Sequence, residues 1–184
     1  MPLHLSASDD ELRSGFFALH TRRDVARLLE VSEDRLRFHL YIVPRPRRYQ
    51  VFQIPKKAGG FRKISAPATA LKILQQKLSR VLQCVYKAKP SAHGFVRERS
   101  IVTNAVQHCG KTWVLNVDLQ DFFPSINFGR VRGLFIAVPY SLNKDVATIL
   151  AQICCFDNAL PQGSPTSPVV SNMICAKMDS QLQR

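Results

Sequence analysis

Residues 111–119, KTWVLNVDL, limit the fold of this chain more than any other segment, because a β-branched and aromatic run here leads to an acid, Asp118. Such a run favours a buried strand. A carboxylate at the end of a hydrophobic strand is costly to bury unless a positive charge meets it. We therefore expect a strand that presents Asp118 to a cation. Taken alone, Asp118 is better explained as a helix cap or a turn residue.

Two helical regions are predicted before residue 41. Residues 8–20 predict a helix that begins with a capping box between Ser8 and Glu11. Residues 24–40 predict two short helices, the second capped by Ser32. Two such helices in succession also outline a helix-turn-helix, but any pair of short amphipathic helices does so, and the outline by itself is weak support for DNA reading.

After the helical region the period of the apolar residues changes. Pro44 and Pro46 are expected to end the helical part in a basic linker, and residues 49–67 predict a β-hairpin with a basic tip. The elements expected next are a helix at 68–87, with Lys72, Lys77 and Arg80 outside its apolar stripe, the strand at 111–119, a helix at 146–156, a turn-rich loop at 160–168 and a helix from 169. This order predicts a mixed α/β fold with helices packed on a sheet.

Composition sets the class of protein. Of the 184 residues, 46% are hydrophobic, which suffices for the core of one domain or two small ones. No apolar stretch approaches the roughly 18 residues of a membrane span, and the N-terminus does not resemble a signal peptide. We therefore expect a cytoplasmic protein with no membrane partner. The five cysteines form no CxxC pair, so we interpret them as buried reduced thiols.

Positive charge is concentrated in the first half of the chain. The formal net charge is +13, and between Arg35 and Arg99 there are 16 basic residues and a single acid, Glu98. Such a density predicts a polyanionic partner, for which nucleic acid is the first candidate. The alternative is a basic surface that only keeps the chain soluble. Aromatic residues that can stack on bases are interleaved with the charges and favour nucleic acid, namely Tyr41, Tyr49, Phe52, Phe61 and Tyr86.

Three segments carry side chains suited to nucleotide chemistry. In VLNVDLQDFFPSI, residues 114–126, Asp121 follows Asp118, and magnesium prefers a few carboxylates together with substrate phosphates. The loop LPQGSPTSP, residues 160–168, holds a Gln-Gly turn that can present its backbone and a carboxamide to a nucleotide. The hairpin supplies cations suited to a triphosphate, namely Lys56, Lys57, Arg62 and Lys63.

In this order the three segments resemble the motifs of reverse transcriptases, and in particular those of the retron type of bacterial enzyme. RKISAP in the hairpin is similar to the fingers motif of that family. Residues 114–126 are similar to the motif that carries the first catalytic aspartate, and residues 160–168 to the motif that follows it. The resemblance begins near Tyr49 and continues to Arg184.

A fourth segment narrows the resemblance. TNAVQHCG contains the NAxxH pattern typical of retron enzymes, at Asn104 and His108, which are implied to be structural or to contact the cognate RNA. The resemblance implies fingers and a partial palm of a right-hand polymerase, preceded by N-terminal helices. The implied domains are an N-terminal helical region with a basic linker at 1–48, fingers at 49–112 and a partial palm at 113–184.

The resemblance assigns catalytic roles to the segment around Asp118. Asp118 is implied to be the first of three aspartates that hold two magnesium ions, assisted by the carbonyl of Leu119. Such a metal pair activates the primer hydroxyl and stabilises the leaving pyrophosphate. Asp121 is implied to turn its backbone toward the incoming triphosphate. Phe123 matches the aromatic gate that excludes a ribose 2′-hydroxyl.

Further positions are implied to bind the nucleotide. Arg62 and Lys56 match the fingers residues that hold the phosphates. Gln162 and Gly163 match the loop that positions nucleotide and template.

One departure from the family pattern is large. The other two catalytic aspartates of the family lie in a YxDD hairpin, and this sequence contains no YxDD. The thumb expected after it is also missing. We therefore expect an N-terminal portion of a retron-like reverse transcriptase that does not polymerise by itself.

The function implied for the complete enzyme is RNA-directed DNA synthesis from a structured non-coding RNA, giving msDNA, in antiphage defence. Its implied partners are the template RNA, an RNA–DNA hybrid, a dNTP and a retron effector protein, with Mg²⁺ as cofactor. One alternative is a non-catalytic nucleic-acid-binding module that uses the basic face. Another is a reverse transcriptase of the group II intron or abortive-infection type, against which the NAxxH pattern argues.

Overall fold

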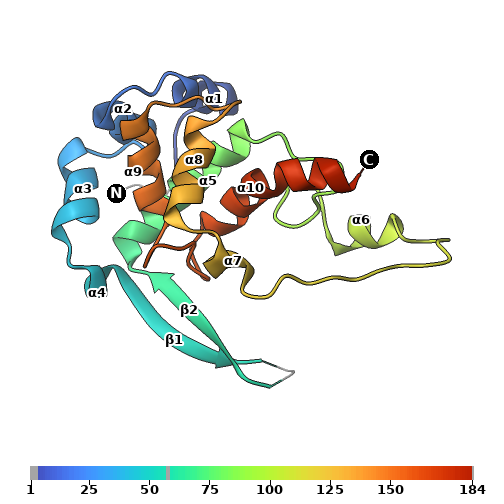
Figure 1. The fold of residues 1–184 in the computed structure, drawn as a ribbon. Coiled ribbons are helices and arrows are strands. Elements are labelled where there is room, and N and C mark those ends of the chain that lie inside the picture. The colour runs from blue at the N-terminus through green and yellow to red at the C-terminus, as the bar shows by residue number, and fades with distance from the viewer. Residues whose placement is uncertain (1–3, 57–58, 184) are drawn as a thin grey trace.

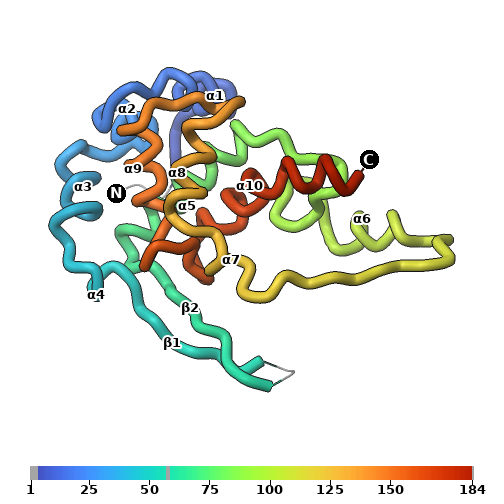
Figure 2. The backbone as a smooth tube through the Cα atoms, viewed as in Figure 1, coloured from blue at the N-terminus to red at the C-terminus, as the bar shows by residue number. Residues whose placement is uncertain are grey.

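The computed structural model describes residues 4–56 and 59–183 of the chain. Two segments project from a body of helices (Figures 1 and 2): the β-hairpin and the arm that carries α6. Lys57, expected to contribute to the phosphate-binding cations, lies outside the described residues.

The N-terminal helices begin where their capping residues predict. α1 (Asp9–Phe17) starts with the expected capping box, in which the Ser8 amide donates to the Glu11 carboxylate at 2.8 Å. The helices that follow are α2 (Arg22–Leu28), α3 (Glu33–Arg37), with the expected Ser32 cap, and the π-helical turn η1 (Phe38–Ile42). The prediction of two helices within residues 24–40 is thus confirmed.

The prediction that Pro44 and Pro46 end the helical part is wrong. Pro44 is the N-cap of a further one-turn helix, α4 (Arg45–Arg48), and Pro46 lies in its first turn. Proline is tolerated there because the amide hydrogen that it lacks would have no acceptor in a first helical turn. The expected basic linker is therefore partly helical and leads directly into the first strand.

The predicted hairpin at 49–67 is confirmed. β1 (Tyr49–Pro55) pairs antiparallel with β2 (Phe61–Pro67), in a register that places Tyr49 opposite Pro67. These two strands make up the sheet of the described residues. Burial is confined to the base of the hairpin, so its distal half projects from the helical body, as Figure 1 shows.

The long core helices lie where the apolar periodicity predicts them. α5 (Thr69–Val85) and α9 (Lys144–Cys154) carry buried aliphatic faces. The other helices are α6 (Ile101–Val106), α7 (Phe122–Ser125), α8 (Phe128–Ile136) and α10 (Ser167–Leu182). In the described part of the chain, every helix is too short or too polar to cross a membrane.

The core consists of helices packed on helices, so the prediction of helices packed on a sheet is wrong. Buried side chains such as Phe16, Leu74 and Phe135 join the N-terminal helices to α5, α8, α9 and α10 in one cluster, to which the strands contribute none of the described members. α1 packs on α5, and α8 packs on α9. The mixed class is correct only in that a small sheet accompanies the helices. The domain boundaries at 48 and 112 stay predictions.

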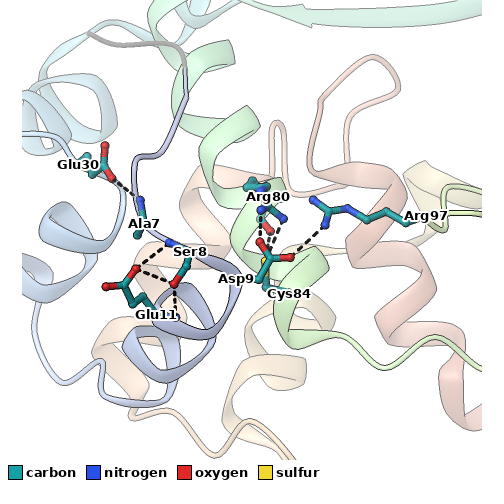
Figure 3. A network of polar contacts seen from close by, with 8 residues as sticks. All are labelled: Ala7, Ser8, Asp9, Glu11, Glu30, Arg80, Cys84 and Arg97. Carbon is teal, nitrogen blue, oxygen red and sulfur yellow. Dashed lines mark hydrogen bonds and ion pairs between the residues drawn. The ribbon is translucent and has the colours of Figure 1, made fainter.

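Polar contacts fasten α1 to more distant segments (Figure 3). Arg80 of α5 donates to the Asp9 carboxylate, and Arg97, which precedes α6, donates to it at 3.2 Å. The bond from Arg80 and the two positive charges lower the pKa of Asp9 below its ordinary value. Because these groups are largely exposed, the contacts orient the elements more than they stabilise the fold.

Lys77 does not lie outside the apolar stripe of α5 as predicted. It is 1% exposed, and its ammonium donates to the carbonyl oxygens of Leu29 at 2.9 Å and Glu30 at 3.2 Å. Carbonyls at the end of a helix lack intrahelical partners and attract a cation. Desolvation lowers the pKa of Lys77. Lys77 thereby fastens the C-terminus of α2 to α5.

The buried strand predicted at 111–119 is absent. The segment returns from the α6 arm to α7 without regular structure (Figure 2), and Trp113, Leu115 and Val117 are 90%, 87% and 76% exposed. A strand needs a neighbour to complete its hydrogen bonds, and both strands of the described residues pair only with each other. The apolar composition of this segment is therefore not sufficient to form a strand.

The cysteines are free in the described residues, as predicted, but their burial varies. Cys154 is fully buried, and burial raises its pKa. Cys109 is exposed on the α6 arm, so the prediction that it is buried is wrong. The residues around Cys109 are exposed as well, because the arm from residue 101 to residue 121 packs little against the helical body.

Candidate functional site

A cleft of about 690 Å³ lies where the hairpin, α7 and the loop before α10 meet. The hairpin lines one part of it with cationic and aromatic side chains, and residues 118–124 line another. The complete lining is Lys56, Phe61, Arg62, Lys63, Asp118, Leu119, Gln120, Asp121, Phe122, Phe123, Pro124 and Gln162. Three segments that are far apart in the sequence, and whose side chains were each predicted to suit nucleotide chemistry, therefore line the same cleft.

The hairpin presents its cations to solvent. Lys56, Arg62 and Lys63 are exposed, and none of the ion pairs within residues 4–56 and 59–183 involves them. Gly59 and Gly60, with φ of 88° and 78°, precede β2, and the Lys56 amide donates to the Gly60 carbonyl at 2.9 Å. Three cations without a carboxylate partner make this side of the cleft suited to an anion.

The loop before α10 is held against β2 by a backbone bond and a close approach. The Ser65 amide donates to the Gln162 carbonyl at 2.8 Å. Gly163 follows with φ of 116°, and a Cβ there would lie 3.1 Å from the Ser65 oxygen and from the Ile64 side chain. Glycine is therefore required by both the backbone conformation and the available space. This contact sets the position of Gln162 relative to the hairpin.

A buried polar network supports the same loop. Its central residue, Gln75, was not among the predicted site residues, and Tyr49, which was predicted to stack on bases, is buried within it. Ser164 donates to the Gln75 carboxamide at 2.9 Å, and Gln75 in turn donates to the Tyr49 hydroxyl at 2.7 Å and to the Ile153 carbonyl at 2.8 Å. Burial raises the pKa of Tyr49, so its hydroxyl stays protonated. A glutamine on the apolar face of a predicted core helix was the signal available in the sequence.

The turn that carries the aromatic pair is anchored in the core. Asp121 adopts the left-handed conformation, with φ of 47° and ψ of 39°, and is the N-cap of α7. Phe122 and Phe123 are half-buried, with ring centroids 5.4 Å apart. Ile126 is buried, and its carbonyl accepts from the Leu160 amide at 3.0 Å. Non-glycine residues in this backbone region occur disproportionately at functional sites.

Asp118 and Leu119 enter the cleft from the exposed segment rather than from a strand. The Asp118 carboxylate and the Leu119 carbonyl are hard oxygen donors of the kind that magnesium prefers, so this part of the site fits that ion. Within the described residues, however, no group of three His, Cys, Asp or Glu side chains is close enough to hold a metal ion. The donor set in this part of the chain is therefore partial.

Asn104 and His108 are not among the residues that line the cleft. Asn104 is on α6, where it lines a neighbouring cavity of about 330 Å³ that shares Leu119 and Phe122 with the cleft. His108 is exposed in the turn that follows α6, and its amide donates to the Ala105 carbonyl at 3.0 Å. The structure thus brings the predicted phosphate-binding, metal-binding and gate residues together, and it leaves the NAxxH pair on the projecting arm.

Comparison with protein families gives one match over most of the chain. Residues 54–184 match the family described as "Reverse transcriptase (RNA-dependent DNA polymerase)". The matched stretch contains every residue that lines the cleft.

Two retron relatives match a larger share of the chain than the family model does. Retron Ec86 reverse transcriptase of Escherichia coli is 34% identical over 171 residues, which cover 92% of this chain and 52% of that protein. Retron Mx65 reverse transcriptase of Myxococcus xanthus is 38% identical over 190 residues, with coverage of 92% and 44%. The putative COX1/OXI3 intron 2 protein of Saccharomyces cerevisiae is 28% identical over 151 residues, with coverage of 71% and 17%. The chain spans about half the length of the two retron relatives.

Proposed function

This chain belongs to the reverse transcriptase family, in which it is similar to retron enzymes, and we propose that it contributes the nucleotide-binding cleft of an RNA-directed DNA polymerase. The proposed reaction adds a deoxynucleotide to the 3′ end of a primer on an RNA template. The juxtaposition of hairpin cations, the Asp118 carboxylate and an aromatic turn in one cleft supports this proposal most directly.

The hairpin cations are proposed to hold the triphosphate. Arg62 and Lys56 face the cleft without carboxylate partners in the described part of the chain, so phosphate oxygens can take that place. Gln162 is proposed to position the nucleotide and the template. Its backbone bond to Ser65 and the close approach at Gly163 keep loop and hairpin at a defined separation.

Residues of the α7 turn are proposed to select the sugar. Asp121 in its left-handed conformation turns the backbone at the cleft edge, and Phe123 lines the cleft while its ring is half-buried against Phe122. A ring fixed in this way cannot move aside cheaply, so it would collide with a ribose 2′-hydroxyl and favour deoxynucleotides.

Asp118 and the carbonyl of Leu119 are the groups that would hold magnesium. When bound, Mg²⁺ lowers the pKa of the attacking hydroxyl and neutralises charge on the phosphates. The sequence has no YxDD, and the described residues hold no cluster of three potential metal ligands. Asp118 therefore supplies one part of the ligand set of a two-metal site, and we expect no polymerase activity from these residues alone.

The biological role follows from the retron similarity and goes further than the cleft geometry. We propose that the template is a structured non-coding RNA, that the product is msDNA and that the complete enzyme acts with an effector protein in antiphage defence. On this proposal Asn104 and His108, which are exposed on the projecting arm, contact the cognate RNA or brace the arm.

A second candidate is a non-catalytic nucleic-acid-binding module. The incomplete metal-ligand set and the net charge of +13 favour it. Such a module would bind nucleic acid in a strongly salt-dependent way that does not require Asp118. The similarity to the yeast intron protein keeps an intron-type polymerase as a further possibility within the family, whereas the NAxxH pattern favours the retron type.

Binding of a fluorescent dNTP to the chain, followed by anisotropy with and without Mg²⁺, tests the proposal. We expect Mg²⁺ to strengthen binding, Asp118→Asn to remove that dependence and Arg62→Gln to weaken binding about tenfold, because a charge-assisted bond to phosphate is lost. Arg47→Gln is the matched control, since Arg47 is exposed and lies outside the cleft lining.

An equal loss of dNTP affinity in Arg62→Gln and Arg47→Gln, or a dNTP affinity that is the same with and without Mg²⁺, would support the non-catalytic module instead. Primer extension on RNA by the chain alone, abolished by Asp118→Asn, would contradict the partial ligand set.

A further inference from the structure

A second cavity, of about 580 Å³, lies between η1, α4 and the turn that follows α9. It shares no lining residue with the cleft. Its lining includes Arg45 and Arg48 of α4, the helix that Figure 1 shows at the base of β1. Its occupant must therefore be something other than the nucleotide held in the cleft.

Aromatic side chains form the inner surface of this cavity. The rings of Tyr49 and Phe156 are stacked, with centroids 4.1 Å apart. Tyr41 of η1 is half-exposed at the rim, and its hydroxyl donates to the Gln152 carboxamide at 2.8 Å, which holds the ring in place. A fixed aromatic ring at the edge of an open cavity is suited to stacking on a planar base.

Cations lie beside these rings. Arg48 is half-buried, and its guanidinium donates to the Val43 carbonyl at 2.8 Å. Arg45 is exposed and takes part in none of the hydrogen bonds or ion pairs between side chains of the described residues. Burial and the neighbouring Arg35 lower the pKa of His39, so its imidazole is neutral near pH 7. The available positive charge is therefore that of the two arginines.

A two-residue turn closed by backbone hydrogen bonds supplies further polar groups to the cavity. Asp157 and Asn158 have φ of 47° and 62°, and reciprocal backbone bonds between Phe156 and Ala159, of 2.9 and 3.0 Å, close the turn. The Asn158 carbonyl accepts from the Phe128 amide at 3.0 Å, which fixes the turn to α8. The side chains of the two central residues remain exposed at the cavity.

We propose that this cavity binds one nucleotide of a single-stranded stretch of RNA. Tyr41 stacks on the base, Arg45 binds its phosphate, and Asp157 with Asn158 accepts and donates hydrogen bonds at the base edge. The inference rests on the proposed function in taking the nucleic acid to be RNA. An acidic peptide would meet the arginines equally well, and Asp157 repels any anion. The exposed Tyr41 ring, which can stack on a base, and the exocyclic amino groups of bases, which donate to a carboxylate, favour the nucleotide.

Anisotropy of a fluorescein-labelled single-stranded RNA, of roughly ten nucleotides, measured over a range of salt concentrations, tests the site. We expect Arg45→Gln to raise Kd several-fold and to reduce the slope of log Kd against log salt by about 0.7, the value for one phosphate of a single strand. Tyr41→Ala should raise Kd about tenfold without changing that slope, because stacking involves no counterion release. Arg47→Gln is the control, since it removes an exposed cation of the same one-turn helix that does not line the cavity.

An equal loss of RNA affinity in Arg45→Gln and Arg47→Gln, or an unchanged Kd in Tyr41→Ala, would contradict the proposed RNA site. Binding would then be due to diffuse surface charge. Circular dichroism of each variant establishes that it is folded. Tighter binding of a DNA strand of the same sequence would overturn the assignment to RNA. Cross-linking of RNA that carries 4-thiouridine is expected at residues 38–49 or 152–158, and exclusive cross-linking elsewhere would also contradict the proposal.

The two proposals fail in different ways. If Arg45→Gln weakens RNA binding while Mg²⁺-dependent dNTP binding is unchanged, both stand. RNA binding that depends on Arg45 and Tyr41, together with dNTP binding that depends on neither Mg²⁺ nor Arg62, would support the RNA site in the cavity and contradict the polymerase proposal. If dNTP binding behaves as expected and the cavity variants bind RNA normally, only the cavity is refuted.

Discussion

Gly163 is the residue at which the backbone conformation and the cleft geometry depend on each other. Its φ of 116° is rarely adopted by residues with a side chain, and the space that a Cβ would need is taken by Ile64 and Ser65. Because the preceding Gln162 bonds to Ser65, movement at this position would also displace the carboxamide from the cleft.

We expect Gly163→Ala to lower the free energy of unfolding by about 1–3 kcal/mol, because the left-handed conformation and the contact are both penalised. Urea denaturation measures this change, and the Kd of the fluorescent dNTP should rise in the same variant. Gly133→Ala in α8 is the control. A Cβ there meets nothing within 4 Å, so alanine should stabilise the helix by about 0.5–1 kcal/mol. A Gly163→Ala variant as stable as the parent would contradict the role of this close approach.

At the scale of elements, the site is built from parts of unequal rigidity. The base of the hairpin is braced by the loop before α10 and by the Gln75 network inside the core. Residues 111–119, which deliver Asp118, are exposed and unpaired in the described structure. Asp118, proposed to hold magnesium, is thus carried by the less constrained segment. The hairpin, proposed to bind phosphate, is carried by the more constrained one.

Hydrogen exchange should separate these segments. We expect amides 113–118 to exchange close to the rate of an unstructured peptide, because they lack backbone acceptors, and those of α9 to be protected by orders of magnitude. Mass spectrometry of peptic fragments measures both. Strong protection within 113–118 in the isolated chain would show that the segment is paired and would contradict the unpaired conformation.

For the whole molecule, charge is distributed so that seven of the 13 acids lie among the N-terminal helices, and five of these seven accept hydrogen bonds there. Hydrogen bonds from serine, threonine or arginine side chains lower the pKa of each of these carboxyls below its ordinary value, the groups being Asp9, Glu11, Asp24, Glu30 and Glu33. Figure 3 shows side-chain hydrogen bonds to Asp9 and Glu11, and for Glu30 it shows the bond from the Ala7 amide. The excess positive charge outside this region remains available to a polyanion.

These carboxyls predict a loss of stability in acid. A carboxyl with a lowered pKa in the folded state stabilises that state above its ordinary pKa, here 3.8 for Asp and 4.5 for Glu, and the contribution disappears as the pH falls through the folded value. The free energy of unfolding should therefore decrease from about pH 5 to about pH 3. Asp9→Asn should make this dependence shallower. Asp10→Asn is the matched control, because the Asp10 side chain takes part in none of the hydrogen bonds or ion pairs of the described residues. A pH profile of Asp9→Asn identical to that of the parent protein would refute the contribution of the contacts from Arg80 and Arg97 to Asp9.

Much of the local structure could be predicted from the sequence. The capping box of α1 and the apolar stripes of α5 and α9 depend on residues three or four positions apart, and the hairpin depends on the alternation on either side of its glycines. Several residues that line the cleft, such as Asp118, Phe123 and Gln162, were expected to share a site because the three motifs occur in a family-specific order, and their roles stay predictions.

What only the tertiary structure decided concerns partners that are distant along the chain. Whether residues 111–119 pair as a strand depends on a neighbouring strand, and composition cannot supply one. Lys77 can be buried because the carbonyls at the end of α2 accept hydrogen bonds from it. The helical periodicity of α5 cannot predict these acceptors, since they belong to a distant segment. The sequence by itself determined hydrogen bonds between near neighbours and the chemistry of the motifs. The packing of helices on helices was determined by which apolar faces meet, because burial is a property of pairs of surfaces and not of a single segment.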